Sequence, residues 1–207
     1  KTQTTEIYFL SPHDAIFVRA ESQFNTLGEL IEYAKANPGL VTFAGSGSNS
    51  SNNLAAIRFN SQADVVTTYV PFSGTGPSIT AVLGGSTMAG FNYATSGISQ
   101  GDALRMLAVA AEERLPAFPD VPTFKELGYD IVGGAYRGVA VPASTPEDLR
   151  QSISDIVSKI NSQPDFVKKM EDGGFVLTDI GYDKMDDFVA KRVEEYTEGA
   201  KALGIIQ

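Results

Sequence analysis

Two glycine-rich polar segments contain the residue types in this 207-residue sequence that are best suited to holding a ligand. Residues 45–53 read GSGSNSSNN and residues 72–78 read FSGTGPS, and each follows a β-rich run and precedes a helical pattern. The first N–H groups of a helix have no partner within the helix, and the helix dipole favours negative charge there. Together with the Ser and Asn donors, the two segments therefore predict a site for a carboxylate or a phosphate.

Each segment supplies several candidate binding residues. In the first segment they are Ser46, Gly47, Ser48, Asn49 and Ser50. In the second segment they are Phe72, Ser73, Gly74, Thr75 and Gly76. A third segment, FNYATS at residues 91–96, adds Asn92 and Tyr93. The alternative interpretation of all three is purely structural: a helix cap at Ser51, a tight glycine turn and an ordinary loop.

Several other kinds of chemistry are disfavoured by the residues that the sequence lacks. The segment at residues 45–53 lacks the third glycine of GxGxxG and the GK[ST] ending of a phosphate-binding loop, which disfavours nucleotide binding. The sequence has no Cys and one histidine, His13, so thiol nucleophiles and His-rich metal centres are excluded. His13 either pairs with Asp14 or caps a turn, and no GxSxG motif supports a hydrolase. We therefore expect no catalytic residue, no metal and no cofactor.

The charge balance disfavours nucleic acid as a partner. The chain has 16 Lys and Arg against 25 Asp and Glu, a net charge of −9 and a sequence pI near 4.6. Phosphate backbones are bound by clustered basic residues, which this composition does not provide. No apolar run approaches the roughly 20 residues that span a bilayer as a helix.

The order of the expected elements predicts an α/β fold. Strands are expected at residues 6–11, 14–20, 40–44, 65–70, 86–92, 105–111, 131–142 and 175–180. Helices are expected after a capping box at residues 26–29, at residues 53–60 and 77–83, from Thr145, and at residues 164–170 and 183–203. A second capping box at residues 123–126 precedes Gly128, which is placed as a helix stop. Alternating strands and helices indicate βαβ units and a largely parallel sheet, whose carboxyl edge is where such folds bind ligands.

Five ordered segments together resemble one family. They are TLGELIEYAKANPG, VTFAGSGSNSSNNLAA, VTTYVPFSGTGPSITAVLGG, RMLAVAAEERLPAFPDVPTFKELGYDI and YRGVAVPASTPEDL. They resemble the periplasmic solute receptors of tripartite tricarboxylate transporters (the TctC/Bug family) over essentially the whole chain. The resemblance implies a periplasmic-binding-protein-like α/β fold, with two lobes of mainly parallel sheets joined by crossing strands.

The resemblance also implies a division of the chain and a site. Residues 1–18 would belong to the first lobe and a crossing strand, residues 19–134 to the second lobe, and residues 135–207 to the return strand and the C-terminal helices of the first lobe. The family's carboxylate loop maps onto residues 73–76 and its polar loop onto residues 46–50. Many members have an acidic residue in place of Asn92 and a histidine in place of Asn53.

The implied function is that of a periplasmic receptor that captures a small organic carboxylate and delivers it to the membrane components of the transporter, without chemistry. The rival is a small α/β hydrolase or transferase acting on an acid, with Ser46 or Ser48 as nucleophile. No recognisable base accompanies either serine. Which carboxylate is bound and the oligomeric state stay open.

Two apolar stripes lead to a further expectation. They are Leu149, Ile153, Ile156 and Ile160 in one helix and Phe188, Val189, Val193 and Tyr196 in another. Each stripe needs a partner surface, and few strands are left to form one. We therefore expect that the first lobe is incomplete in this chain, which lacks the family's N-terminal portion, and that this face is uncovered or covered by another chain.

Overall fold

The chain folds into two compact units, which are described separately. The computed structural model describes residues 4–202 and 206. The first unit contains the residues up to Ser11, Tyr136–Met170 and the residues from Leu177 onward. The second unit contains Pro12–Ala135 and Glu171–Val176. Assignment of the units to the lobes of a receptor stays a prediction.

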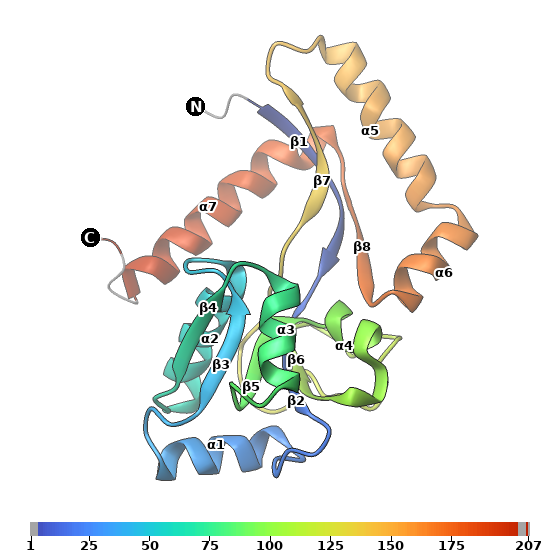
Figure 1. The fold of residues 1–207 in the computed structure, drawn as a ribbon. Coiled ribbons are helices and arrows are strands. Elements are labelled where there is room, and N and C mark those ends of the chain that lie inside the picture. Colours follow the sequence, from blue (N-terminus) through green and yellow to red (C-terminus); the bar gives the residue numbers. More distant parts are fainter. Residues whose placement is uncertain (1–3, 203–205, 207) are drawn as a thin grey trace. The chain divides into compact units, whose positions relative to one another are not determined.

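The second unit is built on a five-stranded sheet (Figure 1). Its strands are β2 (Asp14–Arg19), β3 (Thr42–Ser46), β4 (Thr68–Phe72), β5 (Ala89–Tyr93) and β6 (Leu104–Val109), in the order β4-β3-β5-β2-β6. Strand β3 pairs in parallel with β4 and β5, whereas β2 pairs antiparallel with β5 and β6. The expectation of a mainly parallel sheet therefore holds for four strands, and β2 alone is reversed. Strand β2 lies between β5 and β6, two strands that come much later in the chain, so its direction is not set by the helix that follows it.

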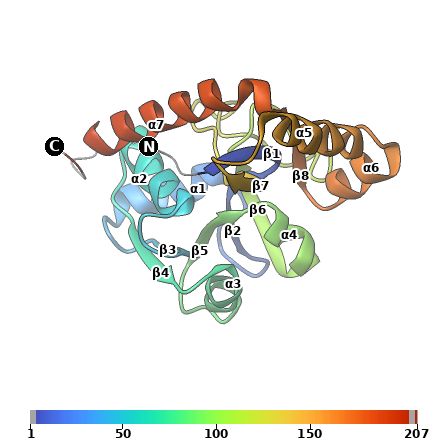
Figure 2. The same cartoon turned by 90° about the horizontal axis from the view of Figure 1, so that it is seen from above.

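Helices cover both faces of this sheet (Figure 2). They are α1 (Leu27–Ala36), α2 (Ser51–Ala63), α3 (Thr75–Leu83), the short α4 (Thr95–Gln100) and the 3₁₀ turn η1 (Gly101–Ala103). Successive strand residues point to opposite faces. Ile16 and Val18 of β2 thus belong to the core beneath α1 and α2, and Phe17 between them packs with Ile79 of α3.

An aromatic cluster fixes α2 against the sheet. Phe59 of α2 lies 5.9 Å from Phe43 of β3, 6.2 Å from Phe91 of β5 and 6.2 Å from Phe124, measured between ring centroids. Phe91 stacks on Phe124 with 6° between the ring planes. All four side chains are fully buried. Because the helix cannot slide on these rings, the loop that enters its N-terminus is held in place as well.

One predicted capping box begins a helix and the other does not. Thr26 Oγ1 accepts from the N–H of Glu29 at 3.2 Å, and the Glu29 carboxylate accepts from the N–H of Asn25, as expected for the start of α1. At the second box the bonds are fully reciprocal: the Thr123 hydroxyl accepts from the N–H of Glu126 at 3.1 Å, and the Glu126 carboxylate accepts from the N–H of Thr123 at 2.8 Å. There the chain makes only turns before Gly128, at φ +90°. The helix predicted after this second box is wrong, because too few residues separate the box from its stop.

The first unit combines a three-stranded sheet with helices. The sheet order is β7 (Arg137–Pro142), β1 (Thr4–Pro12), β8 (Phe175–Ile180), and β1 pairs antiparallel with β7. The helices are α5 (Glu147–Asn161), α6 (Pro164–Asp172), the 3₁₀ turn η2 (Tyr182–Lys184) and α7 (Met185–Ala202). The sequence also predicts an N-cap hydroxyl at Thr145 and proline at the first helical position, but Pro146 itself stands at the N-cap of α5 with no side-chain hydrogen bond, so that prediction is wrong.

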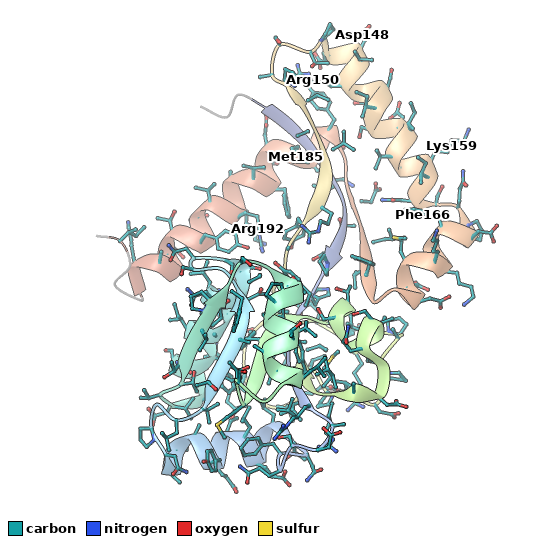
Figure 3. All side chains as sticks on the ribbon, viewed as in Figure 1. Asp148, Arg150, Lys159, Phe166, Met185 and Arg192 are labelled. Atoms are coloured by element: carbon teal, nitrogen blue, oxygen red, sulfur yellow. The ribbon has the colours of Figure 1, made fainter. Side chains whose placement is uncertain are left out.

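Much of the apolar surface of α5 and α7 is exposed. Leu149, Ile156 and Ile160 of α5 are 50, 58 and 41% exposed, and Val193 and Tyr196 of α7 are 59 and 44% exposed. In contrast Met185, at the start of α7 in Figure 3, is buried. The expected exposure of the two stripes is therefore confirmed for three residues of α5 and two of α7. Among the described residues, no helix combines the length and the apolar character needed to cross a membrane.

Candidate functional site

The candidate loops of the second unit meet at one edge of its sheet. In the parallel pair of β3 and β4, Ser46 is aligned with Phe72, and β5 continues the parallel set. Strand β2 starts at this edge, where Asp14 is aligned with Tyr93. The expectation that the segments at residues 45–53, 72–78 and 91–96 leave one sheet edge is therefore confirmed.

The first loop opens directly into the N-terminus of α2. Gly47 and Asn49 have positive φ values of 80° and 57°, which turn the chain sharply after β3. Ser50, rather than Ser51, is the N-cap, and its hydroxyl accepts from the N–H of Asn53 at 3.3 Å. The first helical bond runs from the N–H of Leu54 to the Ser50 carbonyl, so the N–H groups of the two residues after the cap precede it. Ser48 and Asn49 are exposed at the turn.

Two tyrosines line this loop. The Tyr69 hydroxyl donates to the Gly47 carbonyl at 3.3 Å and lies 3.4 Å from the Ser50 hydroxyl, and the hydroxyls of Tyr93 and Ser51 are 3.1 Å apart. Burial raises the pKa of Tyr69, so its hydroxyl stays neutral and able to donate. A Cβ at Gly45 would overlap the Tyr69 ring end, so this glycine makes the arrangement possible. The loop thus offers hydroxyl groups rather than cations.

The second loop opens into the N-terminus of α3. Gly74 is the N-cap and brings no side-chain acceptor, and the first helical bond joins the N–H of Ser78 to the Gly74 carbonyl at 3.3 Å. The N–H groups of Thr75 and Gly76 precede that bond. Ser73 and Gly76 are exposed, whereas Phe72 is half-buried and packs on the core beneath α3.

Asn92 supports this helix end from below. It is fully buried, its Nδ2 donates to the Ser78 hydroxyl at 2.7 Å, and its Oδ1 accepts from the Thr75 hydroxyl at 3.4 Å. A side chain with no exposed surface and these partners positions the start of α3. Its neighbour Tyr93 is partly exposed at the same edge.

Asp14 is a buried acid that the sequence interpretation did not include in the site. Its side chain is 1% exposed, and its Oδ1 accepts from the Nδ2 of Asn52 at 2.5 Å. The Oδ1 of Asn52 in turn accepts from the hydroxyl of Ser46. Burial raises the pKa of Asp14 from 3.8 to about 7, and the Asn52 hydrogen bond offsets part of that shift. The signal in the sequence was an acid opening a strand, DAIFV, that is otherwise apolar.

His13 does not take part in this cluster. Its Nδ1 lies 2.9 Å from the Ala110 carbonyl and donates to it, and burial lowers the pKa of the ring. The suggested pairing with Asp14 is therefore wrong. Within the part of the chain that the structure describes, no three His, Asp or Glu side chains gather as a metal site.

In open α/β folds, ligands bind at the sheet edge where the loops after the strands and the helix N-termini gather, as they do here. The family model of the tripartite tricarboxylate transporter family receptor, TctC, matches residues 3–205, and the chain belongs to this family. The members of this family are receptors and not enzymes.

Curated relatives agree with the family assignment. A protein of Cupriavidus necator, named as the UPF0065 protein in the gbd 5' region, is 33% identical over 153 residues, which are 73% of this chain and 46% of that protein. Protein BugT of Bordetella pertussis is 31% identical over 126 residues, 59% of this chain and 39% of BugT. The chain spans about half the length of the curated relatives it matches.

Solved structures show the same fold at low identity. Rpa4515 of R. palustris with adipate superposes with a TM-score of 0.90 at 20% identity, over 98% of this chain and 69% of that one. MatC of Rhodopseudomonas palustris with bound malate gives 0.81 at 23% identity, over 95 and 69%. The periplasmic binding protein BugD gives 0.83 at 23% identity, over 98 and 69%. The α/β periplasmic-binding-protein fold expected from the sequence is thereby confirmed.

Proposed function

We propose that this protein is a periplasmic receptor that binds a small organic carboxylate and delivers it to the membrane components of a tripartite tricarboxylate-type transporter. Membership of the receptor family supports the role, and two proteins of the same fold are described with adipate and malate.

The observation that carries the proposal is the pair of helix N-termini at one sheet edge. The N–H groups of Ser51 and Asn52 in α2, and of Thr75 and Gly76 in α3, precede the first hydrogen bonds of their helices. Hydrogen bonds from such groups to a carboxylate are charge-assisted, and each contributes about 1.5–3 kcal/mol. A site made of dipoles and neutral hydroxyls holds an anion without a buried cation, which suits a receptor that has to release its ligand.

The proposed binding residues follow the two loops. They are Ser46, Gly47, Ser48, Asn49 and Ser50 from the last residue of β3 onward, Phe72, Ser73, Gly74, Thr75 and Gly76 from the last residue of β4 onward, and Asn92 and Tyr93, the last two residues of β5. Within this set we assign Asn92 to positioning Thr75, because its side chain is fully buried.

A single backbone N–H provides the test. In Thr75→Pro the ring removes that N–H at the first helical position, where proline is well tolerated. Gly74 is extended, at φ 167° and ψ −177°, as the residue before a proline prefers. Thr75→Val, which keeps the N–H but, like the proline variant, loses the hydroxyl that donates to Asn92, is the matched control. Binding is measured by isothermal titration calorimetry with malate and with adipate.

We expect Thr75→Pro to weaken binding by about 10- to 100-fold, the loss of one charge-assisted hydrogen bond, while Thr75→Val binds much like the wild type. Circular dichroism and the melting temperature report whether the variant is folded. Unchanged affinity in folded Thr75→Pro would refute the role of α3. Failure of the wild type to bind either acid would refute the proposed function for these ligands.

A further inference from the structure

Asp14 occupies a fixed position beside the proposed anion site. Its N–H donates to the Gly133 carbonyl at 3.0 Å, and its carbonyl accepts from the N–H of Ala110 at 2.7 Å. Across the sheet it is aligned with Tyr93 of β5. Because the backbone is held on both sides, the side chain cannot leave the interior without disruption of β2.

A short hydrogen-bond chain connects this carboxyl to the first ligand loop. Asn52 is the second residue of α2 and is fully buried. Its Nδ2 donates to Asp14 at 2.5 Å, and its Oδ1 accepts from the hydroxyl and, at 3.4 Å, the N–H of Ser46. The carboxyl and the loop therefore lie on opposite sides of one amide group.

The groups that face Asp14 provide little compensation for a negative charge. The charge of Asp14 contributes to the raised pKa of the Tyr69 hydroxyl, so the two lie within electrostatic reach, and Tyr93 faces it across the sheet. The ring of His13 donates to the Ala110 carbonyl instead. Among the described residues, no Lys or Arg forms an ion pair with Asp14. An ionised Asp14 is thus a buried charge stabilised chiefly by one amide.

A carboxylate bound at the α2 N-terminus would add a second negative charge just beyond Asn52. Two like charges at a partly buried site repel, and the protonated form of the acid is then favoured. We propose that Asp14 has to be protonated when the ligand binds, so that capture of the carboxylate takes up a proton and the ligand is released by rising pH. This inference rests on the proposed function and specifies how the same site is regulated.

The direction of the pH dependence follows from linkage. In the free protein the pKa of Asp14 is about 7, and a bound anion raises it further. Below that pKa the group is protonated in both states and affinity is constant. Above it each further pH unit weakens binding by up to about tenfold, until Asp14 ionises in the complex as well.

Calorimetry at several pH values tests this coupling. The wild type is titrated with malate and with adipate between about pH 6.5 and 8.5, where simple carboxylic acids are already ionised. Each titration is repeated in two buffers of different ionisation enthalpy, which reports protons taken up. We expect affinity to fall by about 20-fold across this range, with net proton uptake above pH 7.

Asp14→Asn keeps the shape and a neutral acceptor for Asn52. We expect its affinity to be independent of pH and its proton uptake to be absent. Asp64→Asn, which changes an exposed acid at the other end of α2, is the matched control and should behave like the wild type. Constant affinity in the wild type, or the same pH profile in Asp14→Asn, would overturn the inference.

An NMR titration separates this inference from the proposed function. The carboxyl ¹³C shift of Asp14 in the free wild-type protein should report a protonated group at pH 6. An ionised Asp14 at pH 5 would overturn the inference whichever ligand binds, and this readout does not depend on a folded variant. No binding of either acid at any pH would overturn the proposed function and the inference together, whereas binding without pH dependence would overturn the inference alone.

Discussion

The buried carboxyl of Asp14 is expected to make the second unit less stable as the pH rises, even without a ligand. Replacement by Asn removes the titration while it keeps an oxygen that can accept from the Nδ2 of Asn52. The folded state of the wild type binds the Asp14 proton up to about pH 7, whereas the unfolded chain releases it near the ordinary value of 3.8. Between these values the folded protein holds more protons, so its stability falls with rising pH.

The size of this effect is set by the two pKa values. Below pH 3.8 Asp14 is protonated in both states, and above about 7 it is ionised in both. Each unit between them corresponds to about 1.4 kcal/mol, so the full loss is about 4 kcal/mol, and the part between pH 5 and 8 is about 2–3 kcal/mol. Asp14→Asn should therefore gain about that much relative to the wild type over the same range.

Urea unfolding at pH 5 and pH 8 measures the effect, since the free energy of unfolding is obtained for both proteins at each pH. The quantity of interest is the difference between variant and wild type, in which the other carboxyl groups cancel. Asp64→Asn is the control and should show the same difference at both pH values. If Asp14→Asn also shows the same difference at pH 5 and 8, the reasoning from burial is refuted.

Two further predictions concern the stability of one unit each, the first from ring packing and the second from a hydrogen bond. Phe59→Ala should destabilise the second unit by about 3–5 kcal/mol in urea unfolding, because its fully buried ring contacts four other rings. The control Val66→Ala, at a 60% exposed position, should cost less than about 0.5 kcal/mol. A cost below about 1 kcal/mol for Phe59→Ala would contradict the packing. Ser154→Ala should destabilise the first unit by about 1 kcal/mol, because the serine hydroxyl accepts from the N–H of Tyr182 at 3.0 Å. Ser158→Ala, at an exposed position of the same helix, controls for helix propensity, and an equal effect of the two changes would argue against the hydrogen bond.

The parts of the fold that were predicted correctly are those with strong local signals. The capping box at Thr26 and the helix stop Asn37-Pro38-Gly39 bracket α1, because both signals act within a few residues. Alternating β-rich and helical runs indicated the βα units, and parallel strands necessarily bring their carboxyl ends to one edge, so the meeting of the loops could be predicted as well. At Thr123 the same local chemistry forms without a helix, so a capping box does not determine how long a helix continues after it.

The parts that were missed depend on contacts between distant segments. Nothing local shows that β2 lies between β5 and β6, so neither its reversed direction nor the burial of Asp14 beside Asn52 could be predicted from the sequence. The sequence places Tyr69 in a strand but does not show that its hydroxyl bonds Gly47, because Gly47 lies in the loop after the neighbouring strand β3. Asn92 was a candidate donor, and its full burial depends on the packing of α3.

The reversed position of β2 also determines when the second unit can fold. The strand is the first of its sheet to be synthesised, yet both of its neighbours come much later, and the side chain of His13 bonds a carbonyl 97 residues further along the chain. Until β5 and β6 exist, the apolar run Ile16-Phe17-Val18 has no sheet to enter. Contacts over such separations close loops at high entropic cost and slow folding. Insertion of β2 between β5 and β6 is therefore expected to be a late step in the folding of this unit.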